Sequence, residues 1–358
     1  MVAPLMSRRS TKYLKAALTA LHYSGAGDLL APMTSGAGAI FMLHQVDPAA
    51  PAAFSPNRIL KVTPDFLAET LQQLIDTGFE FLSLDQVAER LRNPQPGARP
   101  FAAFTLDDAY RDNLEHAAPV FRRFGVPYTV YAPIDYIDGS GDLWWLSLEH
   151  AIAALERIEC TIEGEAVSIA ATTVAAKDAA YHTLYWRLRK IDETIARAIV
   201  RDLCTQASVD TSGLCRSMVL GWDELRTLAA DPLVTIGAHT VRHFALSKLG
   251  PGAARHEMTA SIKRLESELG RPVRHFSYPF GDTCSAGDRE FDLARELGLA
   301  TAVTTRKGLI HAHHASALNA LPRVSLNGDY QDPIYTKALL SGAPFALYDL
   351  ARWVVAIG

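Results

Sequence analysis

The chain has 358 residues, of which 49% are hydrophobic and 21% are charged, a composition typical of an ordinary soluble globular protein. This length allows one large domain with an insertion, or two modest domains. The formal net charge of −4 gives no argument for binding nucleic acid or an anionic membrane, and no apolar stretch approaches the roughly 18 residues that span a bilayer.

Residues 1–35 are predicted to form a helical N-terminal segment. Four basic residues precede the apolar run 16–21, but the run is short and His22 interrupts it, so the pattern resembles a signal peptide only superficially. We therefore expect a cytoplasmic protein without a transmembrane span. A basic helix over residues 8–22 can make peripheral contact with a membrane, although packing on the rest of the protein is the favoured interpretation.

Between residues 36 and 328, short β-rich apolar runs alternate with helical patterns. Eight runs are predicted to be strands: 39–43, 79–82, 101–106, 128–132, 234–237, 275–278, 300–304 and 321–324. One intervening helix begins after Thr63, which can cap it, and ends at Gly78, while another spans about 252–269 and ends at Gly270. Such an alternation predicts a parallel sheet, either open or closed into a barrel.

Residues from about 134 to 217 break this alternation and are predicted to form a largely helical insertion, with helices around 151–157 and over 179–204. The insertion is long enough to form a lid or a wall of a substrate site. Its Trp144 and Trp145 can stack on a sugar ring, although core packing is the more common role for either one. Residues 329–358 are expected to form a helical C-terminal appendage.

Side chains that can bind a metal follow two of the predicted strands. Asp107 and Asp108 end the run 101–106, and His239 and His243 follow the run 234–237. Because α/β barrels carry their chemistry at the C-terminal ends of their strands, we expect these residues to meet. The two histidines can reach one ion if residues 238–244 are helical. One carboxylate and two imidazoles make a three-ligand site with open positions, and the second carboxylate is then free to act as a base.

Three motifs, taken in order, resemble those of the polysaccharide deacetylases, carbohydrate esterase family four with its NodB-type domain. They are Thr105-Leu106-Asp107-Asp108, His239-Thr240-Val241-Arg242-His243 and Tyr278-Pro279-Phe280-Gly281. The resemblance extends from His44 in Phe-Met-Leu-His to Arg323 in Leu-Pro-Arg-Val, apart from the middle segment. It implies a distorted (β/α) barrel of about seven strands. It also implies a metal-dependent hydrolase that removes N-acetyl groups from a sugar in an oligosaccharide, a polysaccharide or a lipid-linked glycan, by attack of a metal-bound water.

The resemblance also implies residue roles. The implied metal ligands are Asp108, His239 and His243. Asp107 is the implied general base, the amide N–H of Phe280 is the expected oxyanion donor, and Tyr278 is expected to contact substrate with Trp144 and Trp145. Zn²⁺ is the expected cofactor, and Co²⁺, Ni²⁺, Mn²⁺ or Fe²⁺ suit the same donors.

Two positions depart from the family pattern. Ser277 stands where the family has an arginine that orients the catalytic aspartate. Arg323 is the candidate to take over that role, with a structural salt bridge as the equal alternative.

The family's general acid is a histidine in a late Leu-x-His motif. Leu309-Ile310-His311 matches it literally but lies in a loop-like stretch without the accompanying tryptophan. His44 is the other candidate for the acid or for a substrate contact, and a structural histidine is equally plausible.

Two other functions stay open on the sequence alone. One is an O-acetyl esterase or small-amide hydrolase that uses the same metal site. The other is a catalytically inactive carbohydrate-binding homologue, which the substituted arginine favours. The retained Asp107 beside Asp108 argues against that alternative, because an inactive protein has no need of both. A cytoplasmic location would favour precursors over finished wall polymer as substrates, and the expected partner is a carbohydrate, not a nucleic acid.

Overall fold

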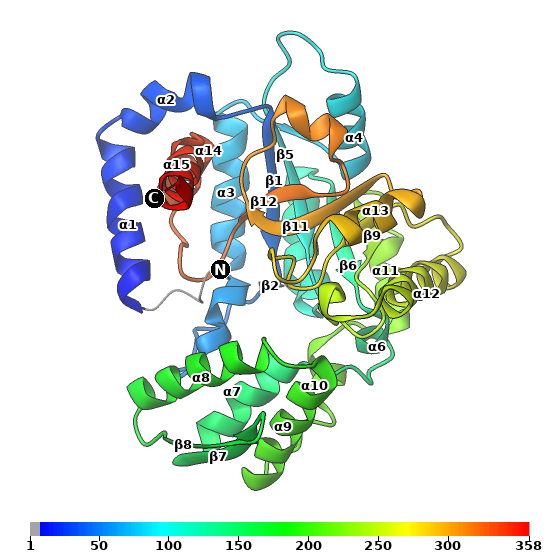
Figure 1. Cartoon of the computed structure of the whole chain (residues 1–358). Coiled ribbons are helices and arrows are strands. Elements are labelled where there is room, and N and C mark those ends of the chain that lie inside the picture. The colour runs from blue at the N-terminus through cyan, green and yellow to red at the C-terminus, as the bar shows by residue number, and fades with distance from the viewer. Residues whose placement is uncertain (1–7, 358) are drawn as a thin grey trace.

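The computed structural model describes residues 8–357 and is built around a closed barrel of parallel strands (Figure 1). Seven strands form the ring, in the order β1-β5-β6-β9-β10-β11-β12 with β12 returning to β1, which confirms the predicted distorted (β/α)7 barrel. Their bounds are β1 (Gly38–Leu43), β5 (Phe101–Leu106), β6 (Tyr128–Ala132), β9 (Val234–Ala238), β10 (His275–Ser277), β11 (Thr301–Lys307) and β12 (Leu321–Ser325). The eighth predicted strand, β4 (Glu80–Phe81), lies outside the ring and pairs with the start of β5.

The barrel closes because its strands are buried apolar runs that pair along both edges. Every residue of β1, β5 and β6 is buried. β1 pairs with all of β5, from Gly38–Phe101 to Leu43–Leu106, and on its other edge Phe41 pairs with Val324 of β12. Strands that are buried on both faces read as continuous hydrophobic runs, which is why the sequence located them well.

Helices cover the outside of the ring. They are α3 (Pro64–Asp76), α5 (Ala118–Phe124), α11 (Trp222–Ala229), α12 (Pro251–Leu269) and α13 (Asp288–Glu296). α4 (Leu84–Arg92) instead packs against the residues inside the ring, such as Ile40 and Val303. The predicted signals operate as expected: the Thr63 hydroxyl accepts a hydrogen bond of 3.2 Å from the Phe66 N–H at the start of α3, and Gly270 ends α12 with φ 64°. A small parallel pair, β2 (Gln45–Val46) and β3 (Lys61–Val62), lies beside the barrel mouth.

Most of the insertion between β6 and β9 forms a separate lobe at the lower end of Figure 1, whereas its first helix, α6 (Ile134–Ile137), lies beside the barrel and contacts α12. The lobe contains α7 (Trp144–Ala154), α8 (Val174–Leu188), α9 (Glu193–Gln206) and α10 (Leu214–Met218), together with the antiparallel hairpin β7 (Arg157–Ile162) and β8 (Glu165–Ala170). The predicted helix 151–157 is wrong at its end, because α7 stops at Ala154 and a strand follows. The predicted helix 179–204 is two helices, α8 and α9. The strand signal that was missed is the alternation of buried Ile158 and Ile162 with exposed neighbours.

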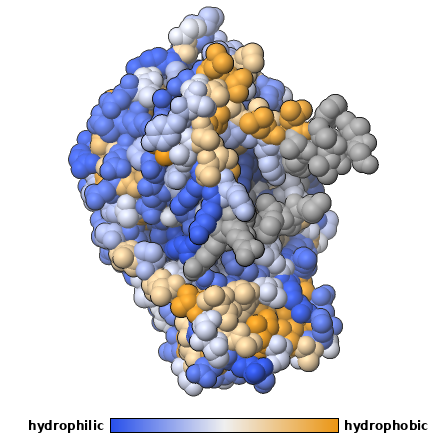
Figure 2. All heavy atoms as spheres, turned by 90° about the vertical axis from the view of Figure 1, so that its left-hand side faces the viewer, coloured by the Kyte–Doolittle hydropathy of each residue, from blue (hydrophilic) through white to orange (hydrophobic). Residues whose placement is uncertain are grey.

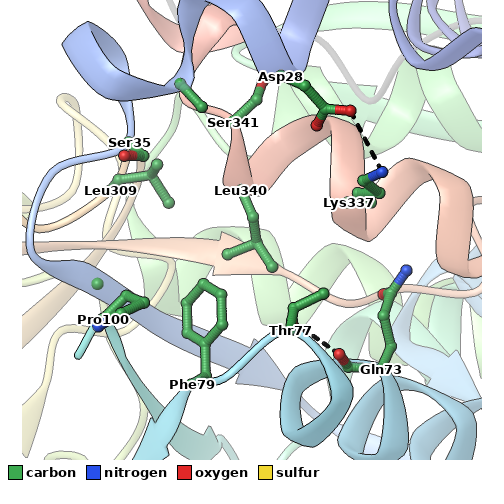
Figure 3. A pocket seen from close by; sticks show the side chains of 12 residues that line it. Asp28, Ser35, Gln73, Thr77, Phe79, Pro100, Leu309, Lys337, Leu340 and Ser341 are labelled. Carbon is green, nitrogen blue, oxygen red and sulfur yellow. Dashed lines mark hydrogen bonds and ion pairs between the residues drawn. The ribbon is translucent and has the colours of Figure 1, made fainter. Parts of the chain in front are cut away.

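The terminal helices α1 (Arg8–Tyr23), α2 (Ala26–Thr34), α14 (Pro333–Leu340) and α15 (Ala343–Ile357) pack together beside α3 (Figure 1). A largely apolar cavity of about 210 Å³ lies between α2, α14 and the barrel, and an ion pair of 3.4 Å joins Asp28 to Lys337 at its edge (Figure 3). α1 contacts α2 and α14, so it packs on the rest of the protein, as favoured above. The proposed division into residues 1–35, 36–328 and 329–358 stays a prediction, and residues 1–7 and 358 lie outside the described residues.

Exposed apolar side chains concentrate on these terminal helices. Ten large apolar side chains are exposed among the described residues, and seven of them lie on α1, α2 and α15: Tyr13, Tyr23, Leu29, Met33, Leu347, Tyr348 and Leu350. Figure 2, a view from the side of α1 and α2, shows orange patches over this part of the molecule. None of the helices within residues 8–357 is long and apolar enough to cross a membrane. Peripheral membrane contact stays a prediction.

Candidate metal centre

A cavity of about 240 Å³ opens at the C-terminal ends of the barrel strands. Seven of the ten predicted site residues line it: His44, Asp107, Asp108, Trp145, His239, His243 and Phe280. They follow β1, β5, β9 and β10, apart from Trp145, which the insertion supplies from α7. The ends of parallel strands meet at one edge of a barrel, so residues far apart in the chain gather here.

Three of these side chains present their ligand atoms to a common point. His239 Nε2 lies 3.5 Å and His243 Nε2 lies 3.2 Å from Asp108 Oδ1, and all three atoms lie within 4.8 Å of one another. Ligands about 2.0–2.1 Å from a tetrahedral ion are about 3.3 Å apart, so these distances fit a metal site. Asp108 Oδ1 is buried without a hydrogen-bond donor among the described residues. A divalent cation would supply the positive partner that this oxygen lacks.

The protonation of the imidazoles also suits a metal. His239 Nδ1 lies 2.6 Å from the carbonyl oxygen of Ser277, which can only accept, so Nδ1 carries the proton and Nε2 has a free lone pair. Burial lowers the pKa of His243, which keeps that ring neutral. Burial alone would raise the pKa of Asp108, but a positive charge at this point, on a protonated His243 above all, outweighs burial and lowers it.

The histidine segment is not helical, so the condition under which the four-residue spacing would place both rings on one helix face is not met. Thr240 and His243 have φ of 67° and 56°, in the left-handed region, and the His243 N–H donates a 2.9 Å hydrogen bond to the Thr240 hydroxyl. The tight loop, instead of a helix face, brings the two rings together, with centroids 4.8 Å apart. Five of the seven described non-glycine residues with positive φ lie in the site loops: Asp108, Ala109, Thr240, His243 and Phe280. Each costs about 1–3 kcal/mol, which indicates a functional constraint on these loops.

Asp107 differs from the three candidate ligands in its partner, which is Arg323 on β12. The guanidinium makes five hydrogen bonds: to both Asp107 oxygens at 2.8 and 2.7 Å, to the Thr105 hydroxyl at 3.0 Å, to the Ser277 hydroxyl at 3.2 Å and to the Thr304 carbonyl at 2.8 Å. All five N–H groups of the side chain are thus used. Burial alone would raise the pKa of Asp107, but the charge and hydrogen bonds of Arg323 outweigh burial and lower it. The small Ser277 leaves room for Arg323 where the family motif has its own arginine.

The loop after β10 brings a backbone donor to the same cavity. Phe280 has φ 61°, its carbonyl accepts a 2.6 Å hydrogen bond from the Thr305 hydroxyl, and its N–H makes no hydrogen bond within residues 8–357. Gly281, with φ 56°, is needed beside it, since a Cβ there would lie 2.6 Å from the Thr305 nitrogen. Phe280 therefore lines the cavity with a backbone N–H that no described residue uses, so its role as an oxyanion donor stays a prediction.

The family model of polysaccharide deacetylases matches residues 95–302, more than half of the chain. The chain belongs to the polysaccharide deacetylase family. Its fold is similar to that of Streptococcus pyogenes deacetylase PplD, solved in complex with acetate, with TM-score 0.56, 18% identity, and coverage of 84% of this chain and 96% of that one. It is also similar to IcaB from Ammonifex degensii, with TM-score 0.52, 15% identity, and coverage of 85% and 97%. No curated protein sequence gives a significant match.

Within this deacetylase fold, two of the predicted substrate residues are not brought to the cavity. Tyr278 is fully buried and its hydroxyl donates to the Asn319 carbonyl at 2.8 Å. Trp144 is buried and stacks on Tyr185, with centroids 5.1 Å apart. His311 also lies elsewhere, because the adjacent Ile310 pairs with Gly38 at the start of β1, whereas the cavity lies beyond the end of that strand. The literal Leu-x-His match is therefore not placed to act as a general acid.

The insertion adds cavity residues that the sequence did not single out. Trp186 lies on α8 and Arg189 just after it. Asp282 also lines the cavity but lies outside the insertion, two residues after Phe280. Trp186 is half-buried and lines the cavity, so it is a second aromatic wall beside Trp145. The only sequence signal for this wall is the run Tyr185-Trp186 on a helix that also carries Tyr181, a pattern that core packing explains equally well.

His44 lies at the cavity on a segment that is held from behind. The Asn113 amide donates to the His44 carbonyl at 2.8 Å, and Asp112 Oδ1 accepts from the Val46 N–H at 3.1 Å and from Asn113 at 2.9 Å. Burial lowers the pKa of His44, so its ring is neutral at neutral pH. Burial also raises the pKa of Asp112 to about 7.

The raised pKa of Asp112 predicts a pH-dependent loss of stability. The folded protein binds the Asp112 proton more tightly than the unfolded chain, whose aspartates titrate near about 3.9, so stability falls as the pH rises from about 4 to about 7 and then levels off. Asp112→Asn removes this term. Thermal unfolding should show the melting temperature of the variant rising relative to wild type by roughly 2–5 °C between pH 5 and pH 8. A difference that is constant with pH would show that Asp112 ionises normally.

Proposed function

We propose that the protein is a metal-dependent N-deacetylase that acts on an acetylated sugar of an oligosaccharide, a polysaccharide or a lipid-linked glycan. The observation that carries this proposal is the division of labour between the adjacent carboxylates. Asp108 faces the two histidines, whereas Asp107 is held by both oxygens on Arg323 at the same cavity. Two carboxylates with different partners can take different roles at one site.

The residues suit hydrolysis of an acetamide. Asp108, His239 and His243 would hold the divalent ion, which when bound lowers the pKa of a water ligand and polarises the acetyl carbonyl. Asp107, ionised and oriented by Arg323, accepts the proton of the attacking water. The Phe280 N–H donates to the oxygen on which negative charge develops. His44 is neutral at rest, so the proton that Asp107 takes up is the one available for the leaving amine. His44 lines the same cavity and would relay that proton.

The structure also bears on the rival functions. An inactive binding protein would not need Asp107 held at both oxygens by a buried arginine next to the candidate ligand set, so the Arg323 arrangement supports an active enzyme. An ester would use the same base and oxyanion donor as an amide, and the geometry does not separate the two. Trp145 and Trp186 form the wall against which a sugar ring would stack. The cytoplasmic location and the identity of the metal stay predictions.

Elemental analysis of protein purified without chelator tests the metal site. Wild type is expected to carry about one transition metal per chain, and His239→Ala/His243→Ala is expected to carry none, because a single carboxylate does not hold such an ion. The loaded enzyme is then offered N-acetylated and O-acetylated sugars, and acetate release is measured. Metal without acetate from either class would contradict the deacetylase proposal. Absence of metal even after soaking in Zn²⁺ would favour the carbohydrate-binding alternative.

A further inference from the structure

Three charged side chains are buried where the insertion meets the barrel. Arg189 lies just after α8, and Glu193 and Arg197 lie on α9, with 9%, 5% and 5% of their surfaces exposed. Glu193 stands between the two arginines: its Oε1 is 3.8 Å from Arg189 Nη1, and its Oε2 is 3.7 Å from Arg197 Nη2. We call this group of three residues the insertion clamp.

Arg197 reaches from the clamp to the loop that carries a metal ligand. Its Nη2 donates a hydrogen bond of 3.2 Å to the backbone carbonyl of His243. Its guanidinium also lies over the ring of Phe244, 4.4 Å from the centroid. The residue that supplies the imidazole ligand, and the residue after it, are therefore both held by one side chain of the insertion.

Arg189 reaches to the loop that carries the expected oxyanion donor. Its guanidinium carbon lies 3.6 Å from the centroid of the Phe280 ring, a cation–π distance, and its Nη2 donates to the Ser285 hydroxyl at 2.8 Å and to Asp282 at 3.3 Å. The Phe280 ring in turn packs edge-to-face on the His243 ring, with centroids 4.9 Å apart. Arg189 thus contacts the side chain of Phe280, whose backbone φ lies in the left-handed region.

Glu193 completes the connection. Besides the two arginines, it accepts a 3.4 Å hydrogen bond from the Ala245 N–H and pairs with Lys248 at 3.3 Å, both on the segment after His243. Buried charges lose hydration that pairing offsets only in part, so such a cluster is a poor device for stability alone. Left-handed non-glycine residues persist only where the surroundings fix them, and the clamp contacts two such residues of the site, His243 and Phe280.

We propose that the insertion clamp positions His243 and the Phe280 N–H, so that the insertion is a positioning element of the metal centre as well as a wall of its cavity. The inference for Phe280 rests on the proposed deacetylase function. The inference for His243 rests only on the metal site.

The test compares Arg189→Met and Arg197→Met with Arg187→Met in the full-length chain. Arg187 is the matched control, because it lies on the same α8 and pairs with Glu165 on the lobe surface. Each protein is titrated with Co²⁺, whose visible absorption reports ligand geometry, and kcat and KM for acetate release are measured. Arg197→Met should bind Co²⁺ about 10-fold or more weakly with an altered spectrum. Arg189→Met should keep the Co²⁺ affinity but lose about 10-fold in kcat at unchanged KM, since an oxyanion donor acts in the transition state.

The lysine variants at both positions keep the charge and should recover part of each loss. If a methionine variant does not fold, the same Co²⁺ titration and kcat measurement are made on the lysine variant and on Glu193→Gln. Wild-type Co²⁺ affinity, spectrum and kcat in both methionine variants would overturn the proposal, even with a lower melting temperature. If wild type binds Co²⁺ but releases no acetate, the deacetylase proposal fails alone and the Co²⁺ titration still decides on His243. If wild type binds no Co²⁺, both proposals fail.

Discussion

Asp107→Asn is expected to lower the rate of acetate release by about 10²- to 10⁴-fold while the metal content stays at the wild-type level. The amide has nearly the shape of the carboxylate and keeps one oxygen for Arg323, but it cannot accept a proton from water. The ligand atoms belong to other side chains, so the ion should remain. The measurement is kcat for acetate release together with elemental analysis of the same preparation.

Asp108→Asn is the matched control for this prediction, because it makes the same chemical change one residue away. It should lose the metal, and the activity with it, since a neutral amide is a poor ligand beside two imidazoles. Acetate release by Asp107→Asn at the wild-type rate would refute the assignment of Asp107 as the base. Loss of metal in both variants would mean that the two carboxylates share the ion instead of dividing their roles.

Arg323→Met is expected to cost about 3–5 kcal/mol of unfolding free energy and most of the activity. The substitution removes all five hydrogen bonds of the guanidinium and leaves the Asp107 carboxylate buried without its partner. Arg323→Lys should recover only part of either loss, because an ammonium cannot bind both carboxylate oxygens in the fixed fork of a guanidinium. Urea unfolding and kcat measure the two effects.

A double variant separates orientation of the base from a purely structural salt bridge at Arg323. Ser277→Arg combined with Arg323→Ser moves the guanidinium to the position that the family motif uses, and the Ser277 hydroxyl already lies 3.2 Å from Arg323 Nη2. If the arginine serves to orient Asp107, the double variant should regain activity that Arg323→Ser alone lacks. Recovered stability without recovered activity would assign Arg323 to structure.

The sequence located the barrel strands because their signal is local. Buried runs such as Phe101–Leu106 are continuous apolar stretches, and the polar residues that end them mark the mouth of the barrel. The four-residue spacing of His239 and His243 fits a helix face, which was the one geometry considered by which they could share an ion, and the structure joins them by a tight loop instead. Nothing in the residue types reveals that Thr240 and His243 adopt left-handed backbone, which long-range contacts impose on them.

The remaining errors have the same origin in tertiary contacts. Tyr278 stands in a site motif, yet it follows Ser277, whose side chain faces Arg323, so alternation turns the Tyr278 ring to the opposite side, into the core. Phe280 reaches the cavity because the chain has left the strand and turns there with φ 61°. Arg189 could not be predicted as a site residue from the sequence, because the Phe280 ring that it contacts lies far from it along the chain. Arg323 was named as a candidate only because Ser277 stands where the family has an arginine, so another arginine was needed for that role.

The way the barrel closes also sets an order of assembly during synthesis. β1 is among the first elements made, but its second edge pairs with β12, the last strand of the described residues. Asp107, Asp108 and both histidines precede β12 in the chain, so the proposed base and all three proposed ligands exist before Arg323 does. A nascent chain therefore carries an unpaired Asp107 next to an unsealed barrel until its final strand emerges, and contacts this distant in sequence form slowly. Arg323, the partner of Asp107, therefore lies on the strand that completes the ring.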